Sequence, residues 1–260
     1  MKYGFIGCGN MGGAIARALA RATGDFMLTD RSGKARAIAQ ELGAAYGTNA
    51  EAAACDRVFL AVKPQMMAGV LRELQPVLAE KKPLLITMAA GLEIGKIEEM
   101  AGVRLPVIRI MPNTPVSVGK GVILYCRNDL VDDATLSQVL NDLRFAGMLD
   151  PLDEKLIDAA CAVSGCGPAY VYLFLEAMAD GAVACGVPRE KALRYAAATL
   201  SGAAELALTT GKHPGELKDA VCSPGGSTIA GVKALEEQGF RGAVMDAIAA
   251  ACRRNQELGK

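Results

Sequence analysis

The sequence predicts an α/β protein in two parts: a doubly wound sheet in the N-terminal part, followed by an all-helical C-terminal dimerisation domain. Three observations support this prediction. Short apolar runs alternate with helical patterns in the first half, which is typical of a parallel sheet covered by helices. A glycine-rich motif directly follows the first apolar run. Beyond about Asp150 the strand signals stop, and helical patterns fill the rest of the chain.

The first half contains the expected strands and the helices between them. Its first four strands are almost continuously apolar, as expected of strands that are covered on both faces. The predicted strands are residues 3–7, 26–30, 58–62, 84–88, 107–111 and 122–126. The predicted helices are residues 12–22, 34–42, 68–78 and 94–100. One more amphipathic helix is indicated by apolar residues at helical spacing, namely Leu136, Val139, Leu140 and Leu143.

The second half carries helical segments and no convincing strand from Lys155 onward. These segments are residues 156–163, 169–185, 189–210, 214–221, 229–238 and 241–257. Gly211 and Gly239 supply stops between some of them. The segment 189–210 has small residues on more than one side, and such a helix needs cover from more than one neighbour. We therefore predict two domains, residues 1–155 and residues 156–260, of which the second forms a homodimer.

The overall composition argues against several classes of protein. Lys plus Arg equals Asp plus Glu at 28 each, so the chain has no basic excess to hold a nucleic-acid backbone. Asp180, Glu205 and Asp246 interrupt the most apolar stretches before they reach the roughly 18 to 20 residues of a membrane helix. The N-terminus shows no secretory signal pattern. We expect a cytoplasmic protein with no nucleic-acid partner and no membrane.

The cysteines and the single histidine give no metal-binding pattern. The 8 cysteines form no C-x-x-C pair, and His213 has no second imidazole to join it, so we expect no metal site. Several cysteines lie in apolar runs, where a free thiol behaves as a small hydrophobic group. Reduced thiols agree with a cytoplasmic location.

The strongest local signal is Gly7-Cys8-Gly9-Asn10-Met11-Gly12, which follows an apolar strand and opens a helix. This context is what a G-x-G-x-x-G motif requires to indicate dinucleotide binding. Gly7 permits a tight turn, Gly9 lets the backbone approach a pyrophosphate, and Gly12 lets the helix pack closely on the strand. Free N–H groups at the helix start, from Asn10 and Met11 onward, then face the phosphates. We expect a Rossmann-type domain here; the alternative is a tight turn without a ligand.

The end of the second strand bears on which nicotinamide cofactor binds. It contains Asp30-Arg31-Ser32, with Lys34 close behind. An acidic residue at this position usually binds the ribose hydroxyls and favours NADH, whereas Arg and hydroxyl groups accommodate the 2′-phosphate of NADPH. We expect NADPH, held by Arg31 and Ser32 if Asp30 turns away from the ribose, with NADH as the alternative. A solvated charge cluster at a strand end is the structural alternative.

Three further loops follow predicted strands and should line the same crevice, because the carboxyl ends of parallel strands meet at one edge of a sheet. These loops are residues 61–65, 89–91 and 111–115. Pro64 and Pro112 stiffen two of them. On their chemistry alone, the loops could equally be rigid structural turns.

Two unusual segments stand out in the helical half. Residues 164–170 have the sequence S-G-C-G-P-A-Y and open a long helix. Residues 223–228 have the sequence S-P-G-G-S-T, a hydroxyl-rich turn that runs into another helix. Backbone N–H groups and hydroxyls that converge at a helix N-terminus make a good carboxylate receptor. The alternative is an ordinary helix start capped by Ser227 or Thr228.

These two segments resemble the signature of pyrroline-5-carboxylate reductases, in which an S-G-S-G-P-A-Y element precedes an S-P-G-G-x-T turn. The resemblance also covers the glycine motif, A-V-K-P-Q at 61–65, A-A-G at 89–91, M-P-N-T-P at 111–115 and H-P-G-E-L-K-D at 213–219. It spans nearly the whole chain, with these landmarks in family order. One departure is Cys166, where the family usually has Ser, and a thiol is the weaker hydrogen-bond partner.

The resemblance implies hydride transfer from NAD(P)H to the imine carbon of 1-pyrroline-5-carboxylate, a cyclic imino acid, to give L-proline in the last step of its biosynthesis. It implies a helical domain that interleaves with a second subunit, in a homodimer that assembles further to a decamer. Thr228 would be catalytic and lie nearest the imine nitrogen. The implied substrate-binding residues are Ser223, Gly225, Gly226, Ser227 and Thr228. The implied cofactor-binding residues beyond the glycine motif and the second strand are Asn49, Val62, Lys63, Pro64, Ala90, Asn113 and Thr114.

The chemistry of these residues agrees with imine reduction, which needs a hydride donor, a held carboxylate and one proton for nitrogen. The hydroxyl-rich turn contains no acid, so the imine would arrive protonated or Thr228 would relay a proton from water, and positioning would supply most of the rate. A β-hydroxyacid dehydrogenase is one alternative, but the helix after Gly167 lacks the Lys and Asn usual in those enzymes. A non-catalytic NADPH-binding protein is the other, and fold alone could not exclude it.

Overall fold

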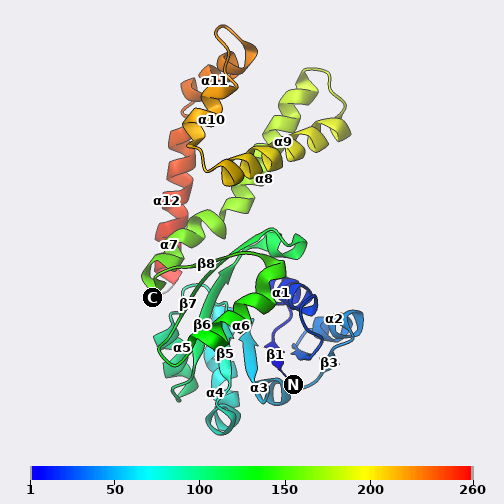
Figure 1. Ribbon diagram of the computed structural model, residues 1–260, viewed down its shortest axis with the longest axis vertical. Coiled ribbons are helices and arrows are strands. Elements are labelled where there is room, and N and C mark those ends of the chain that lie inside the picture. Colours follow the sequence, from blue (N-terminus) through cyan, green and yellow to red (C-terminus); the bar gives the residue numbers. More distant parts are fainter. Residues whose placement is uncertain (1, 259–260) are drawn as a thin grey trace. The chain divides into compact units, whose positions relative to one another are not determined.

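The computed structural model describes residues 2–258, which divide into two compact units (Figure 1). The first unit contains the chain up to Cys166 together with the C-terminal end from Ala251, and the second contains Gly167–Ala250. The predicted domain boundary at residue 155 lies before this division. The helix that follows it stays with the first unit because its buried side chain Ile157 packs against Met111 and Leu124 of the sheet.

The first unit is built on an eight-stranded sheet with the order β3-β2-β1-β4-β5-β6-β7-β8. The strands are β1 (Tyr3–Ile6), β2 (Phe26–Thr29), β3 (Ala45–Tyr46), β4 (Arg57–Leu60), β5 (Leu84–Thr87), β6 (Val107–Pro112), β7 (Gly121–Arg127) and β8 (Gly147–Pro151). Its helices are α1 (Asn10–Ala20), α2 (Lys34–Leu42), α3 (Asn49–Ala53), α4 (Pro64–Lys81), α5 (Ile94–Ala101), α6 (Asp133–Leu143) and α7 (Glu154–Ser164), with the 3₁₀ turns η1 (Thr114–Val118) and η2 (Arg144–Ala146).

Helices cover both faces of this sheet, as the apolar strands predict. β1, β5 and β6 are buried along their whole length. Successive residues of a strand point to opposite faces, so Phe5 joins the core beneath α1 and α2, whereas Ile6 joins the core beneath α4 and α5. The Phe5 ring stacks on the Phe59 ring of β4 with 4.3 Å between centroids. Because helices pack on both faces of the sheet, the strand ends at which the dinucleotide loops begin are held in place.

The sheet departs from the predicted parallel arrangement at one pairing, because β6 and β7 are antiparallel. The chain between them contains only η1, which is too short for a crossover to a parallel neighbour. The other pairings are parallel. The doubly wound plan is therefore confirmed, with this one antiparallel pair near its edge.

The sequence analysis missed the strands β3 and β8, the helix α3 and the 3₁₀ turns η1 and η2 of the first unit. β3 and β8 are edge strands with mostly exposed residues. α3 is a short helix that begins with a capping box between Thr48 and Glu51. None of them contains the long apolar or periodic run on which the prediction depended. In addition, α4 begins at Pro64 rather than at residue 68, since proline is favoured in the first turn of a helix.

The second unit is helical throughout its described residues, as predicted. Its helices are α8 (Gly167–Ala184), α9 (Arg189–Thr210), α10 (Pro214–Ala220), α11 (Ser227–Glu237) and the first part of α12 (Phe240–Leu258). The Phe174 and Phe240 rings of α8 and α12 lie 5.5 Å apart. Few apolar side chains of this unit are buried within the chain, and Leu173 remains 67% exposed. Its helices therefore present apolar surface that the single chain does not cover.

One stretch is long and apolar enough to span a membrane by length and composition alone. It runs from Glu154 to Ala184 and includes α7 and α8. Charged residues interrupt this stretch, as expected, because Asp158 and Glu176 bound its longest uncharged run, residues 159–175. The same composition is found in core helices of soluble proteins, and it leaves open what covers the apolar side chains of α8.

Candidate active site

The glycine loop between β1 and α1 has the geometry that its motif predicts. Gly7 adopts a φ of +100°, and a Cβ there would lie 2.7 Å from the carbonyl oxygen of Ala61. A Cβ on Gly12 would lie 2.4 Å from the carbonyl oxygen of Gly7, whereas nothing lies within 4 Å of that position on Gly9. Gly9 is the N-cap of α1, and no described side chain caps this helix. The first N–H groups of α1 are thus available to an anion.

The carboxylate of Asp30 lies at the end of β2, beside the glycine loop. Its Oδ2 accepts a hydrogen bond from the Ser32 hydroxyl at 2.8 Å, while its Oδ1 is buried and has no partner among the described residues. A buried polar atom without a partner is costly, so this oxygen fits a hydroxyl donor such as that of a ribose. Asp30 lines the hollow of the expected cofactor site and does not turn away from it.

A hollow of about 300 Å³ opens at the ends of β1, β2 and β4, where the carboxyl ends of parallel strands meet. The predicted cofactor residues that line it are Gly7, Gly9, Arg31, Ser32, Asn49, Val62 and Lys63. Asn49 is oriented by Thr29, whose hydroxyl donates to the Asn49 Oδ1 at 3.2 Å. The structure thus brings half of the predicted cofactor residues to one hollow.

Four other predicted cofactor residues lie beside this hollow. Asn10 lines a neighbouring hollow of about 260 Å³. Met11 and Gly12 continue the first turn of α1, and Pro64 is the first residue of α4. Their backbones belong to the two helix starts at the crevice, so a cofactor contact from them remains a prediction.

The last three predicted cofactor residues lie on loops farther along the strand ends. Ala90 is exposed between β5 and α5, and Thr114 is exposed at the start of η1. Asn113 is buried, and its side-chain amide is already hydrogen-bonded to the backbone at Val122 and at Ser164. The Asn113 side chain is therefore engaged with the protein backbone, and its cofactor role stays a prediction.

Several residues that line the hollow were missed by the sequence analysis, and two of them lie on one helix. Met66 and Val70 reach it from α4. Their signal was present, because two residues four positions apart lie on the same helix face. The predicted helix began at residue 68, which left Met66 in a loop and hid this spacing.

Cys8 lies within the glycine motif and is buried. Burial, together with the nearby Asp30 carboxylate, raises the pKa of the Cys8 thiol to about 12. The thiol is therefore neutral at ordinary pH and contributes to the hollow as a small apolar group, since nucleophilic chemistry requires a thiolate.

The hydroxyl-rich turn lies in the second unit, between α10 and α11. Gly226 is the N-cap of α11, and no described side chain caps this helix. The alternative in which Ser227 or Thr228 caps it is therefore wrong, because these residues occupy the first two helical positions. Gly225 has a φ of +67°, a conformation that glycine adopts without strain.

The hydroxyls of this turn are free to meet a ligand. Ser223, Ser227 and Thr228 are exposed, and their hydroxyls make no hydrogen bond with any residue from 2 to 258. A Cβ on Gly226 would lie 2.4 Å from the Ser223 Oγ, so only glycine admits the Ser223 hydroxyl at this place. Free hydroxyls beside an uncapped helix start can together hold a carboxylate.

The histidine serves a structural purpose. His213 is the N-cap of α10, and its Nδ1 accepts a hydrogen bond from the Gly215 N–H at 3.1 Å. Across the described part of the chain, no group of three or more His, Cys, Asp or Glu side chains is arranged to hold a metal ion. The turn at 223–228 thus contains hydroxyl and backbone groups as its polar chemistry.

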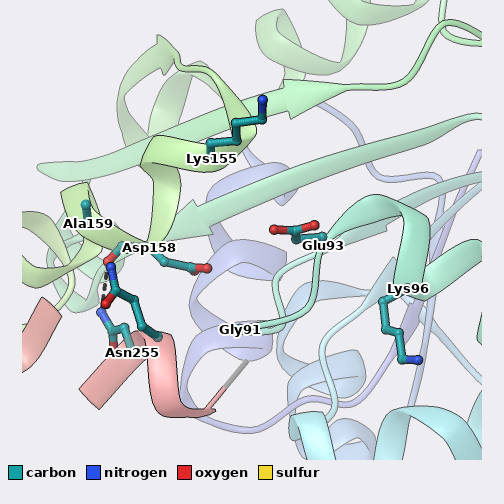
Figure 2. Close-up of a pocket in the computed structure, with 8 residues that line it drawn as sticks. Gly91, Glu93, Lys96, Lys155, Asp158, Ala159 and Asn255 are labelled. Carbon is teal, nitrogen blue, oxygen red and sulfur yellow. Dashed lines mark hydrogen bonds between the residues drawn. The ribbon is translucent and has the colours of Figure 1, made fainter. Parts of the chain in front are cut away.

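A hollow of about 380 Å³ lies elsewhere on the first unit, beside the start of α5, α7 and the end of α12 (Figure 2). Figure 2 shows the carboxylates of Glu93 and Asp158 pointing toward each other, while Lys96 and Lys155 extend away. The lining residues are Gly91, Glu93, Lys96, Lys155, Asp158, Ala159, Asn255 and Gln256. Gly91 belongs to the loop 89–91 that was predicted to line the cofactor crevice, but no residue given a cofactor, substrate or catalytic role is among them, so we do not assign this hollow to the reaction.

The fold and the crevice define a class of protein. A doubly wound sheet, a glycine loop that leaves an uncapped helix start, and an orphaned carboxylate oxygen where a ribose would lie together fit a nicotinamide dinucleotide. With a separate helical unit that carries a turn of free hydroxyls at an uncapped helix start, the chain has the plan of a Rossmann-type oxidoreductase.

Comparison with known proteins identifies the family within this class. Residues 154–258 match the family described as pyrroline-5-carboxylate reductase dimerisation, and residues 2–91 match NADP oxidoreductase coenzyme F420-dependent. The chain is 41% identical to the pyrroline-5-carboxylate reductase of Escherichia coli K12 over 267 aligned positions, which cover 100% of this chain and 98% of that protein. The chain therefore belongs to the pyrroline-5-carboxylate reductase family, as its motifs predicted.

Solved structures agree with this assignment. The pyrroline carboxylate reductase of Plasmodium falciparum, solved with NADP bound, matches with a TM-score of 0.88 and 36% identity, covering 100% of this chain and 98% of that one. A 3-hydroxyisobutyrate dehydrogenase of Mycobacterium tuberculosis matches with a TM-score of 0.53 and 16% identity, covering 88% and 72%. At such identity the second likeness concerns the fold alone, so it gives no support to the hydroxyacid dehydrogenase alternative.

Proposed function

We propose that the protein reduces 1-pyrroline-5-carboxylate to L-proline with NADPH as the hydride donor, the last step of proline biosynthesis. One observation carries this proposal. The chain belongs to this family and contains both an open glycine loop and a turn of free hydroxyls. When bound, the reduced dinucleotide supplies the hydride. The chain's own residues bind the cofactor and the substrate, orient them and supply the hydrogen bonds.

The cofactor site is proposed from the groups that face the crevice. The open space at Gly9 and the free N–H groups of α1 suit the pyrophosphate. Arg31 and Ser32 line the hollow at the end of β2, where they would meet a 2′-phosphate. The NADP in the Plasmodium falciparum relative supports NADPH as the donor, and the presence of Asp30 keeps NADH as a second substrate to be measured.

The substrate site is proposed from the hydroxyl-rich turn. The substrate carboxylate would accept hydrogen bonds from the Ser223 and Ser227 hydroxyls and from N–H groups at the start of α11, with Gly225 and Gly226 leaving room for it. Thr228 would hold the imine nitrogen and relay a proton from water, because the turn has no acid. The rate would then depend mainly on positioning.

Replacing Thr228 tests its proposed catalytic role. We expect Thr228→Ala to lower kcat by about a hundredfold, in the range of a positioned proton-transfer group, while the protein stays folded and dimeric. Thr228→Ser keeps the hydroxyl and should retain most of the activity. Steady-state kinetics, with circular dichroism and size-exclusion chromatography as checks of folding, measure this. An unchanged kcat in Thr228→Ala would remove Thr228 from the mechanism.

The reaction itself is tested by following reduced nicotinamide absorbance, which falls when an imine is reduced and rises when a hydroxyacid is oxidised. We expect turnover with pyrroline-5-carboxylate and none with a β-hydroxyacid and oxidised cofactor. Turnover with the hydroxyacid alone would favour a dehydrogenase, and cofactor binding without turnover of either would favour a non-catalytic protein. The ratio of kcat/KM for NADPH and NADH settles the preferred donor in the same assay.

We also propose that the protein is a cytoplasmic homodimer that assembles to a decamer. The match of residues 154–258 to a dimerisation family and the exposed apolar side chains of the second unit support the dimer. A partner subunit, rather than lipid, would then cover α8, so the protein should stay in solution without detergent. Native mass spectrometry measures both the dimer and the decamer.

A further inference from the structure

The carbonyl of Ser164, at the last residue of α7, has lost its helical donor. In a continuous helix this oxygen would accept from the N–H four residues later, but that residue is Pro168, which has no N–H. The Gly165 N–H makes the ordinary helical bond to the carbonyl of Cys161 at 2.8 Å, and the Cys166 N–H shares that same carbonyl at 3.0 Å, which ends the regular pattern of α7. The break between α7 and α8 thus leaves the Ser164 carbonyl to be satisfied from outside the helix.

Asn113 supplies the missing donor. Its Nδ2 donates to the Ser164 carbonyl at 2.8 Å, and its Oδ1 accepts from the Val122 N–H at 2.8 Å. The residue is 7% exposed and lies between β6 and η1, directly before Thr114. A buried amide with both ends engaged holds three pieces of backbone together: the end of β6, the start of β7 and the end of α7.

The first turns of α7 are fixed independently. Arg109 of β6 is wholly buried and contacts Asp158 at 2.7 Å and Glu154 at 3.4 Å. Glu154 also accepts the N–H of Ile94, the first residue of α5, at 2.8 Å. Because this end of α7 is anchored without Asn113, the amide of Asn113 controls what remains, namely the last residue of α7 before the chain enters the second unit.

We propose that Asn113 is a positioning residue for the reduction, holding the end of α7 against the loop at the carboxyl end of β6. This inference rests on the proposed function. The loop at β6 belongs to the edge of the sheet where the cofactor hollow opens, and the chain beyond α7 leads to the hydroxyl-rich turn. Hydride transfer is sensitive to displacements of about 1 Å, which can cost about a hundredfold in rate. Asn113 therefore acts on kcat through Ser164, without touching the reacting atoms.

Asn128 offers a matched control at the opposite end of β6. Its Oδ1 accepts from the Val107 N–H at 3.1 Å, and its Nδ2 donates to the Leu105 carbonyl at 2.7 Å and to Glu98 at 3.1 Å. Like Asn113, it joins backbone segments through a partly buried amide. Removing either side chain costs hydrogen bonds, two at Asn113 and three at Asn128, but Asn128 lies far along the strands from the cofactor edge.

The experiment compares Asn113→Ala with Asn128→Ala in the full-length protein. We expect both variants to melt at similarly lowered temperatures, while kcat falls about tenfold to a hundredfold only in Asn113→Ala. The Kd for NADPH should stay within about twofold in both, and the primary isotope effect with deuterated NADPH should rise in Asn113→Ala alone. Equal kcat values in the two variants, or a loss of NADPH affinity as large as the loss of kcat, would overturn the proposal.

Asn113→Asp keeps the proposal testable if Asn113→Ala does not fold. It retains an acceptor for the Val122 N–H but replaces the donor to Ser164 with a second oxygen. We expect the same loss of kcat with the same NADPH affinity, and wild-type kcat in this variant would contradict the proposal. If the wild-type protein fails to reduce pyrroline-5-carboxylate, the proposed function fails instead, which distinguishes the two.

Discussion

Among single residues, the glycine loop separates what folding requires from what binding requires. Gly12 has the carbonyl of Gly7 where a side chain would begin, whereas the space at Gly9 is empty in the chain itself. The first constraint acts on the protein whether or not cofactor is present. The second acts when a pyrophosphate approaches the backbone.

Alanine substitutions distinguish these two constraints. We expect Gly12→Ala to lower the free energy of unfolding by about 1 to 3 kcal/mol, the usual cost of overpacking. Gly9→Ala should leave stability nearly unchanged and raise the Kd for NADPH by about tenfold or more, equivalent to at least about 1.4 kcal/mol. Denaturant unfolding and fluorescence titration measure the two quantities. Wild-type affinity in Gly9→Ala would show that the pyrophosphate does not lie there.

The orphaned oxygen of Asp30 predicts an effect on cofactor choice. Asp30→Asn removes a negative charge from the hollow shared with Arg31 and Ser32. We expect kcat/KM to rise about threefold to tenfold with NADPH and to fall by a similar factor with NADH, since one charge-assisted hydrogen bond differs by about 1 kcal/mol. Arg31→Ala should move the ratio the other way. Equal changes with both cofactors would mean that Asp30 does not contact the ribose.

At the scale of elements, α7 is joined to the sheet by charge as well as by packing. Arg109 is 0% exposed, and its Nε has no partner among the described atoms. Its two carboxylate partners on α7 are each about one quarter exposed. The guanidinium therefore depends on Asp158 and Glu154 more than they depend on it, because only the guanidinium has lost all contact with water.

Removing one partner tests this dependence. We expect Asp158→Ala to lower the free energy of unfolding by about 2 to 4 kcal/mol, since it removes the nearer partner of a buried charge and leaves only Glu154 at 3.4 Å. As a control, Asp129→Ala removes the partner of the exposed Arg104 and should change stability little. Denaturant titration of both variants gives the comparison. A similar small effect in both would show that Arg109 does not need Asp158.

The sequence predicted those elements whose own apolar residues indicate that they are buried. β1, β2, β4 and β5 were recognisable because their sequences are almost continuously apolar. The edge strands β3 and β8 were not, since an exposed strand needs no apolar run and is held by backbone pairing. The direction of β7, in contrast, could have been predicted, because the short connection from β6 does not allow a crossover to a parallel neighbour.

For the whole molecule, the second unit raises the question of what completes its core. Ala179, Ala192 and Ala196 are its buried apolar side chains, whereas Tyr172 and Leu173 on α8 are more than half exposed. So much apolar surface favours burial against another subunit. The family match of this region concerns dimerisation, which gives the same answer.

A charge placed on this surface should weaken the dimer. We expect Leu173→Asp to raise the dimer dissociation constant at least about a hundredfold, because burying an unpaired carboxylate costs several kcal/mol, and to lower activity at dilute concentration. Leu130→Asp, on an exposed loop of the first unit, is the matched control and should remain dimeric. Sedimentation or light scattering across concentrations decides between them. A dimeric Leu173→Asp would place the interface elsewhere.

The sequence by itself determined the doubly wound sheet, the helical second half and the family, because apolar periodicity and the glycine, proline and hydroxyl motifs are local patterns. It also indicated the cofactor crevice through Gly7, Gly9 and Gly12. Only the tertiary structure decided that Asp30 keeps an unpartnered oxygen and that Asn113 joins β7 to the end of α7. Those facts depend on contacts between side chains and backbone that are far apart in the sequence, and local sequence patterns do not predict such contacts.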